Sequence, residues 1–176
     1  MGENKALRSF RGNPLLRRQL DLLEPLFQEL ILGANDPAPY ASFNIRVVPD
    51  LLAERCALTG IHALLKAASQ KRVFAVACDL PFLNPALVEK LLSLPDNYDA
   101  IVPESDRGLE PLHAVYSKSC IPAIEDAARR GSWKVSDFYP SIRVERLRIR
   151  DGDWLMDGRS PFLNVNTPEE WRSAAP

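Results

Sequence analysis

A single carboxylate, Asp79, stands where the sequence most clearly offers chemistry. It directly follows an apolar run, residues 73–78, and is followed in turn by Leu80 and Pro81. A carboxylate at the end of a buried strand is well placed to hold Mg²⁺, which takes one or two carboxylates together with waters and substrate phosphates. The alternative is structural: Asp79 would cap a helix that starts near Pro81. The residues alone leave both interpretations open.

Two further polar side chains, Asn35 and Asp50, each follow a short apolar run. In an open α/β sheet, ligands gather beyond the carboxyl ends of the strands. If the runs are strands of such a sheet, Asn35, Asp50 and Asp79 stand along one rim. Asn35 and Asp50 also lie beside prolines, where Asn and Asp are common turn formers, so turn chemistry is the competing explanation for each.

The remaining candidates carry weaker signals. Lys5 follows a glycine-containing segment, and a lysine there can neutralise phosphate charge, although a surface lysine is the commoner explanation. His62 and His113 lack a second ligand at metal-binding spacing, so packing or hydrogen bonding is expected for both. The sequence supports neither a Ser-His-Asp nor a Cys-His nucleophile set. Cys78 ends an apolar run and is expected to be a small buried residue.

These residues depend for their positions on alternating strands and helices. The apolar spacing predicts helices at Pro14–Phe27, Leu58–Ala68, Pro85–Leu94 and Ser119–Arg130 and from Thr167–Pro168 onward, with Thr59 as a cap, and strands at Leu30–Leu32, Ile45–Val48, Val73–Cys78, Asp99–Val102, Leu112–Tyr116, Ile142–Ile149 and Phe162–Val165. This order predicts an α/β, Rossmann-like fold, a mostly parallel open sheet with helices on both faces.

Length, charge and cysteine usage narrow the class of protein. The 176 residues predict a single domain over 1–176. The net charge of -1, from 22 basic and 23 acidic side chains, offers no general attraction to nucleic acid or an anionic membrane. No apolar run approaches the roughly 20 residues of a membrane span. Three widely spaced cysteines without a CxxC pair argue against a zinc site and favour a reducing cytoplasm.

Several segments resemble, in order and spacing, the signatures of molybdenum cofactor guanylyltransferases. The resemblance covers nearly the whole chain, and its most specific parts are the segments Glu-Pro-Leu-His-Ala-Val-Tyr and Leu-Asn-Val-Asn-Thr-Pro. The strand-Asp-Leu-Pro segment around Asp79 is shared by many nucleotidyltransferases. The matching segments are residues 1–7, 46–50, 58–63, 77–83, 108–116 and 162–170.

The resemblance implies a Rossmann-like enzyme that transfers GMP from GTP to the phosphate of molybdopterin with Mg²⁺ and releases pyrophosphate. It implies that Lys5 contacts the GTP phosphates and that Asp79 binds both Mg²⁺ and nucleotide. Asn35 and Asp50 would hold the guanine nucleotide, and Asn164 and Asn166 would lie on the opposite wall. Molybdoenzyme chaperones or other cofactor-biosynthesis proteins are the implied protein partners.

The chain departs from the family pattern in two places. The family has a strand and a Gly-rich loop before the segment that starts at Met1, so we expect both to be missing from this sequence and some strand edges to be unpaired. Residues 55–57, Arg-Cys-Ala, stand where the family tends to have Gly-x-Gly-Pro. Two alternatives therefore stay open: a related enzyme that uses CTP or a sugar-phosphate acceptor, and a non-catalytic homologue that binds a protein partner.

Overall fold

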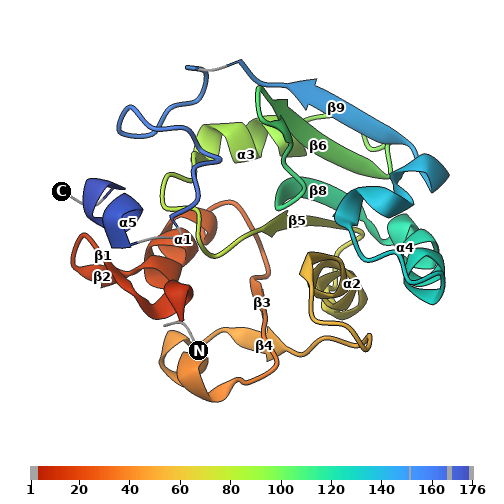
Figure 1. Cartoon of the computed structure of the whole chain (residues 1–176), viewed down its shortest axis with the longest axis horizontal. Coiled ribbons are helices and arrows are strands. Elements are labelled where there is room, and N and C mark those ends of the chain that lie inside the picture. Colours follow the sequence, from red (N-terminus) through yellow and green to blue (C-terminus); the bar gives the residue numbers. More distant parts are fainter. Residues whose placement is uncertain (1–3, 151, 166–167, 175–176) are drawn as a thin grey trace.

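The computed structural model describes residues 4–150, 152–165 and 168–174, which form an α/β fold (Figure 1). Its helices and strands, in chain order, are η1 (Lys5–Leu7), β1 (Ser9–Phe10), β2 (Asn13–Pro14), α1 (Leu15–Leu23), β3 (Ile31–Gly33), η2 (Ala38–Phe43), β4 (Arg46–Val48), α2 (Ala57–Ala67), β5 (Arg72–Val76), α3 (Pro85–Leu92), β6 (Ala100–Ser105), β7 (Gly108–Leu109), β8 (His113–Ser117), η3 (Lys118–Cys120), α4 (Ile121–Arg129), η4 (Val135–Ser141), β9 (Val144–Arg148) and α5 (Pro168–Ala174).

The main sheet contains β5, β6, β7, β8 and β9. β8 pairs antiparallel with both β5 and β6, whereas β9 pairs parallel with β6. Strands β5, β6 and β9 therefore share one direction, and β8 runs against them because the short connection through β7 returns the chain directly beside β6. The Rossmann-like α/β class is confirmed, with β8 as an antiparallel member that the apolar pattern did not reveal.

A second pair, β3 and β4, forms a separate two-stranded parallel ladder. Within the described residues β3 pairs only with β4, and β5 pairs only with β8. Helix α2 contacts both β3 and β5 and so spans the space between the two sheets (Figure 1). The short hairpin β1–β2 leads directly into α1.

Alternation along the strands divides the core of the main sheet between its two faces. Ala114 and Tyr116 of β8 pack with helices α2 and α4, whereas Val115 packs with α3. Successive side chains of a strand point to opposite faces, so one apolar strand can supply two cores. Phe138 of η4 closes the α4 side and is fully buried. Both faces of the main sheet are covered, as the sequence predicted.

Several helix ends differ from their predicted positions. Helix α1 stops at Leu23, just before Pro25, because a proline cannot continue the backbone hydrogen bonds of a helix. Thr59 is not the cap of α2; Cys56 occupies that position, and the Thr59 hydroxyl accepts a hydrogen bond from the Cys56 backbone N–H at 3.2 Å. Asn84 caps α3 by accepting hydrogen bonds from Ala86 and Leu87.

The predicted strand at Phe162–Val165 is wrong. These residues form a turn and an irregular segment, although Phe162 and Val165 are both buried. The apolar side chains are needed to pack against the sheet and α1 rather than to extend a ladder. Asn166 and Thr167 lie outside the described residues, and the helix predicted to follow them is confirmed as α5.

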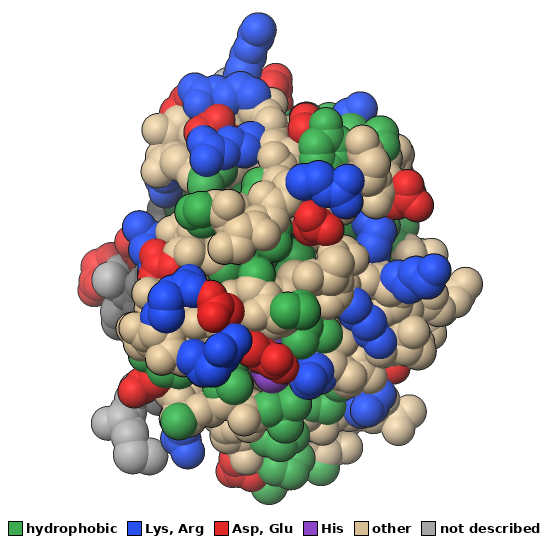
Figure 2. Space-filling model, turned by 90° about the vertical axis from the view of Figure 1, so that its right-hand side faces the viewer, with side chains coloured by type: hydrophobic (Ala, Val, Ile, Leu, Met, Phe, Trp, Pro, Cys, Tyr) green, Lys and Arg blue, Asp and Glu red, His purple; other side chains and the backbone are tan. Residues whose placement is uncertain are grey.

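The face of the molecule in Figure 2 carries interspersed charges of both signs. Strand β9 lies at the edge of the main sheet and exposes Arg146 and Arg148. Arg148 forms a salt bridge with Asp106 at 2.6 Å, and Arg143 just before β9 forms one with Asp99 at 3.3 Å. Among the described residues, no helix has both the length and the apolar character that crossing a membrane requires.

His113 of β8 lies between the rings of Phe74 and Phe162, with centroid distances of 5.2 and 5.1 Å. Its side chain is buried, and neither ring nitrogen has a hydrogen-bond partner among the described residues. Burial disfavours the charged form and lowers the pKa of His113 to about 3. The imidazole is therefore a neutral packing group, as its isolated position in the sequence predicted.

This burial predicts a pH-dependent stability. In the unfolded chain His113 titrates near its ordinary pKa of about 6.5, so its contribution is fully present above that pH and is lost as pH falls toward about 3. We expect His113→Phe to flatten the fall in free energy of unfolding between these limits, measured by urea denaturation at a series of pH values. An equally steep profile in the variant would contradict the assignment; His62→Phe is the comparison, because His62 has a carboxylate partner in Glu125.

Candidate active site

Asp79 lies immediately beyond β5, in the turn that leaves the carboxyl end of the strand. Its carboxylate oxygen Oδ2 is 3.6 Å from the ammonium of Lys5, and the two side chains are 21% and 42% exposed. The structure therefore brings together two candidates that are 74 positions apart. The cap role considered for Asp79 is not observed, since no helix starts at Pro81.

Gln19 of α1 holds the turn that carries Asp79. Its buried amide group donates one hydrogen bond to the carbonyl of Ala77 at 2.9 Å and a second to the carbonyl of Leu80 at 3.0 Å. The two carbonyls flank Asp79, so a single side chain fixes the backbone on both sides of the carboxylate. The sequence signal for this role was a lone glutamine among the leucines of a helix.

Asn35 and Asp50 form a second pair at the carboxyl ends of β3 and β4. The Asn35 amide donates to the Asp50 carboxylate at 2.7 Å, and the Asp50 backbone N–H donates to Asn35 Oδ1 at 2.9 Å. These reciprocal bonds fix both side chains without using all of the carboxylate's acceptor capacity. A role in forming the turns and a role in binding are compatible for this pair, because the two hydrogen-bonded side chains still face solvent.

The segment at the start of the described chain connects the two pairs. Asn4 donates to the hydroxyl of Tyr40 at 2.9 Å, which joins η1 to η2 in the β3–β4 connection. Ala6 is buried in one cluster with Leu16 and Leu20 of α1, and Leu32 near the end of β3 and Cys78 beside Asp79 pack against this cluster. Tyr40 had no recognisable signal in the sequence. Lys5 therefore belongs to a segment that lies across the carboxyl ends of both sheets.

Asn164 approaches Asp79 from the other side. The backbone N–H of Val165 donates to the carbonyl of Asp79 at 3.3 Å, and the side chain of Asn164 is exposed. The role of Asn164 on the opposite wall stays a prediction, and Asn166 lies outside the described residues. Burial, together with the charge of Asp79, raises the pKa of the Cys78 thiol. Cys78 is consequently a poor nucleophile, as expected from its apolar run.

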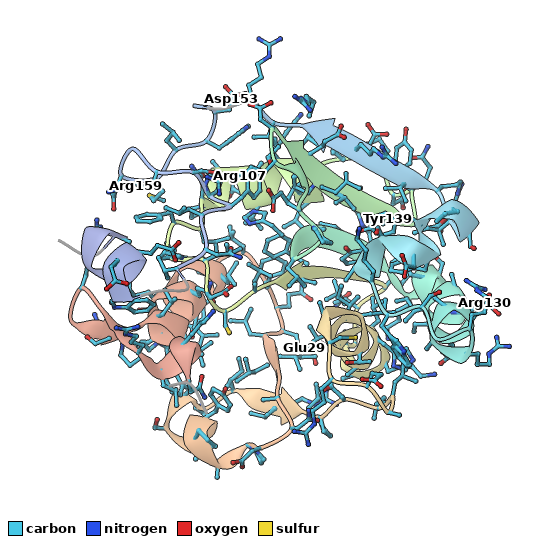
Figure 3. All side chains as sticks on the ribbon, in the orientation of Figure 1. Glu29, Arg107, Arg130, Tyr139, Asp153 and Arg159 are labelled. Carbon is cyan, nitrogen blue, oxygen red and sulfur yellow. The ribbon has the colours of Figure 1, made fainter. Side chains whose placement is uncertain are left out.

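The carboxyl end of β6 adds a polar cluster that the sequence analysis did not single out. Ser105 donates to the Glu110 carboxylate at 2.7 Å, and its oxygen accepts from the backbone N–H of Arg107 at 3.1 Å. Burial raises the pKa of Glu110. Because β5 and β6 share one direction, this cluster lies on the same rim of the sheet as Asp79, with Arg107 in the turn after β6 (Figure 3).

Comparison with known proteins identifies the family. The family model of the MobA-like NTP transferase domain matches residues 1–143. The chain belongs to this family. A probable molybdenum cofactor guanylyltransferase of Pelotomaculum thermopropionicum is 39% identical over 97% of the chain and 83% of its own length. The molybdenum cofactor guanylyltransferase of Desulfosudis oleivorans is 35% identical over 98% of the chain and 86% of its own length.

Solved structures agree with this family. Molybdopterin-guanine dinucleotide biosynthesis protein A from Archaeoglobus fulgidus superposes with a TM-score of 0.81 at 25% identity, covering 99% of this chain and 90% of its own. The 2-C-methyl-D-erythritol 4-phosphate cytidylyltransferase of Thermus thermophilus superposes with a TM-score of 0.67 at 18% identity, covering 97% and 92%. The second likeness concerns the fold alone. This MobA-like chain is a nucleotidyltransferase.

The role of Gln19 in supporting Asp79 can be tested by Gln19→Leu. Leucine preserves the volume but leaves the carbonyls of Ala77 and Leu80 without their donor, which costs about 1–3 kcal/mol for each buried group left unsatisfied. We expect a lower free energy of unfolding in urea. Gln70→Leu is the control, because Gln70 is exposed and its amide donates to the side chain of Gln28 at the surface. Equal losses in the two variants would contradict a special role for Gln19.

Proposed function

We propose that this MobA-like enzyme transfers GMP from GTP to the phosphate of molybdopterin, forming molybdopterin guanine dinucleotide and releasing pyrophosphate. The observation that carries the proposal is the 3.6 Å approach of Lys5 to Asp79 at the carboxyl end of β5. At this rim, an ammonium can neutralise the negative charge of a triphosphate, and a carboxylate can hold the metal ion that accompanies the triphosphate. The relatives named as guanylyltransferases supply the substrate class.

The Asn35–Asp50 pair is assigned to guanine. With Asn35 donating to Oδ2, the carboxylate of Asp50 retains acceptor positions. Guanine has an N–H and an exocyclic amine side by side on its pairing edge, and a carboxylate can accept from both at once. Cytosine offers only its exocyclic amine next to acceptor atoms. The pair therefore favours GTP over CTP.

Lys5 and Asp79 are assigned to the phosphates and to Mg²⁺. The described residues contain no group of three or more His, Cys, Asp or Glu side chains that could enclose a metal. The carboxylate of Asp79 fits a Mg²⁺ ion that takes one carboxylate from the protein and completes its coordination shell with phosphate oxygens and water. Asp79 would hold this ion, which would supply positive charge at the departing pyrophosphate. Lys5 would neutralise the phosphates from the opposite side.

The reaction needs positioning more than proton transfer. A phosphate oxygen of the acceptor already carries negative charge, so no side chain has to remove a proton from it. The chain's task is to align this oxygen with the α-phosphate of GTP and to exclude competing water. Asn164, beside Asp79, and Arg107, at the end of β6, stand on the side of the rim assigned to the acceptor. Arg107 would attract its phosphate.

The free cysteines and the fate of the product indicate the cellular compartment and the protein partners of the enzyme. The three cysteines are free, which suits a reducing compartment, and we assign the enzyme to the cytoplasm. The product has to pass to a molybdoenzyme, either directly or through a chaperone or another protein of cofactor biosynthesis. These partners are part of the proposal and belong to the surface around the acceptor side of the rim.

Calorimetric titration of the protein with GTP, and with CTP as the control, tests the nucleotide assignment. We expect GTP to bind with Mg²⁺ and CTP to bind at least about tenfold more weakly, the equivalent of roughly 1.4 kcal/mol. Equal affinities would overturn the role given to Asn35 and Asp50. GTP binding without pyrophosphate release in the presence of molybdopterin would instead support a non-catalytic homologue.

Asp79→Asn tests the metal assignment. The amide keeps the shape of the side chain but removes the charge that would hold Mg²⁺, so we expect turnover to fall by about 10²-fold or more while the thermal midpoint changes little. The matched control is Asp96→Asn, because Asp96 is exposed in the loop that enters the amino end of β6. Undiminished turnover in Asp79→Asn would remove Asp79 from the reaction.

A further inference from the structure

Glu110 is a carboxylate of the rim to which the proposed reaction gives no role. It precedes β8, which pairs antiparallel with β5. Beyond this ladder the Ala77 N–H still donates to the carbonyl of Leu112 at 3.0 Å. Asp79 and Glu110 each stand two residues beyond this bonded pair. Neighbouring strands are about 4.8 Å apart, so Glu110 lies one strand away from Asp79, in the direction of β6.

The turn that carries Glu110 is fixed by three hydrogen bonds. The Ser105 hydroxyl donates to Oε1 of Glu110 at 2.7 Å, and the backbone N–H of Glu110 donates to the carbonyl of Pro103 at 2.9 Å. From the core, the buried Tyr116 donates its hydroxyl to the carbonyl of Pro111 at 2.8 Å. A group held in this way meets a ligand without losing further conformational freedom.

The Glu110 carboxylate can accept more hydrogen bonds than it has. Within the described residues, Ser105 is its only hydrogen-bond donor, and a carboxylate has about four acceptor positions. Burial raises the pKa of Glu110, whereas the nearby charge of Arg107 acts in the opposite direction. A partly desolvated acceptor gains free energy from a new donor. Because the charge of Arg107 repels a metal ion but not a neutral N–H, the group that fits Glu110 is a neutral donor.

The same arrangement occurs at the other end of the rim. One carboxylate oxygen of Asp50 is held by the Asn35 amide at 2.7 Å, as one oxygen of Glu110 is held by Ser105. The pair assigned to the phosphates and Mg²⁺ lies between them, at the end of β5 (Figure 1). Guanine, assigned to Asp50, has a ring N–H beside an exocyclic amine. The pterin ring of the proposed acceptor carries the same two donors.

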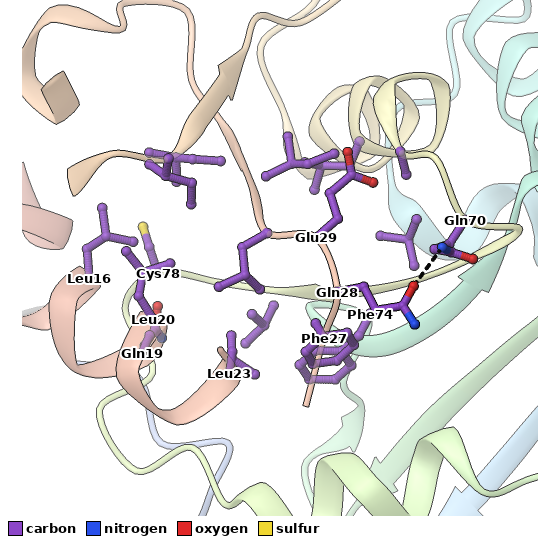
Figure 4. A pocket seen from close by; sticks show the side chains of 18 of the residues that line it. Leu16, Gln19, Leu20, Leu23, Phe27, Gln28, Glu29, Gln70, Phe74 and Cys78 are labelled. Atoms are coloured by element: carbon purple, nitrogen blue, oxygen red, sulfur yellow. Dashed lines mark hydrogen bonds between the residues drawn. The ribbon is translucent and has the colours of Figure 1, made fainter. Parts of the chain in front are cut away.

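A small cavity beside Ser105 offers room for a flat ring. It lies at the carboxyl ends of β6 and β9 and measures ≈ 250 Å³ with its open mouth. Ile149, Leu155 and Phe162 give it apolar surface, and Ser160 adds a hydroxyl. The larger cavity between β3 and β5 is lined mostly by apolar side chains instead (Figure 4). Heterocycles bind where apolar walls meet a few polar groups, and at Ser105 the small cavity meets the Glu110 carboxylate.

The segment 160–165 connects this cavity with the position assigned to the metal. Ser160 and Phe162 line the cavity, and the Phe162 ring packs on His113 at a centroid distance of 5.1 Å. Farther along, the backbone N–H of Val165 donates to the carbonyl of Asp79 at 3.3 Å. An acceptor that lies along this segment has its ring at the cavity and its phosphate near Asp79.

We propose that Glu110, held by Ser105, selects the acceptor by accepting hydrogen bonds from the ring N–H and the exocyclic amine of its pterin. This inference rests on the proposed function, which supplies the pterin-bearing acceptor. The role is recognition, and no covalent bond forms or breaks at Glu110. A pteridine with an oxygen in place of the amine would place an acceptor against the carboxylate, and the site would reject it.

The test compares two ligands by ligand-observed NMR titration without GTP: hydroxymethylpterin phosphate, and hydroxymethyllumazine phosphate, in which an oxygen replaces the amine. We expect the protein to bind the pterin about tenfold or more tightly. Glu110→Gln keeps the shape and an acceptor for Ser105 but loses the charge, so it should weaken the pterin alone and abolish the preference. Glu89→Gln is the matched control, because Glu89 is exposed on α3, and it should keep the preference.

A second titration, of Glu110→Gln with GTP and Mg²⁺, separates recognition of the acceptor from metal binding. We expect the GTP affinity to stay unchanged; its loss would assign Glu110 to the Mg²⁺ site and overturn the proposal. Equal binding of the two pteridines, or binding of neither, would also overturn it. If such a protein still transfers GMP to molybdopterin, the proposed reaction stands and only the role of Glu110 fails. Selective pterin binding without GMP transfer would support Glu110 and remove the reaction.

Discussion

The Gln19 amide is the contact on which the rim most depends. It joins α1 to the backbone on both sides of Asp79, by hydrogen bonds to the carbonyls of Ala77 and Leu80. Helix α1 also lines the cavity between β3 and β5, so the same helix borders that cavity and fixes the turn that carries the carboxylate. Buried polar groups have to be paired, so the leucine-rich helix can carry this one amide only where two carbonyls await it.

Strand β5 both belongs to the main sheet and carries candidate site residues at its carboxyl end. Its ladder with β8 ties it to the main sheet, and its side chains Val73, Phe74 and Val76 line the cavity between β3 and β5. Its carboxyl end supplies Cys78 and Asp79 to the rim, opposite Lys5. The half-buried character of most of its side chains reflects this position between a complete ladder and an open edge.

The sequence predicted the polar side chains at the carboxyl ends of the strands better than it predicted the residues that hold those side chains in place. Asp79, Asn35 and Asp50 could be placed because polar residues directly after apolar runs stand at strand ends in an α/β sheet. Lys5 was linked to Asp79 only through the family resemblance, since no spacing rule joins residues so distant. Gln19 and Tyr40 were missed because their roles depend on tertiary partners.

Local sequence also failed where tertiary packing decided the conformation. Phe162–Val165 has the composition of a strand, yet its apolar side chains are satisfied by packing without a ladder partner. β-Propensity largely measures how well side chains fit a half-buried surface, and an irregular segment can offer such a surface too. The antiparallel direction of β8 followed from a short connection, which apolar periodicity does not record.

The arginines of β9 bear on how the protein behaves at high concentration. An exposed strand edge is a template on which other chains can assemble, and charged side chains along it are a common protection. Arg146 and Arg148 place charged, exposed side chains along this edge, and a second chain that paired with it would have to desolvate them. The charges of β9 thereby disfavour growth of the main sheet at its outer edge.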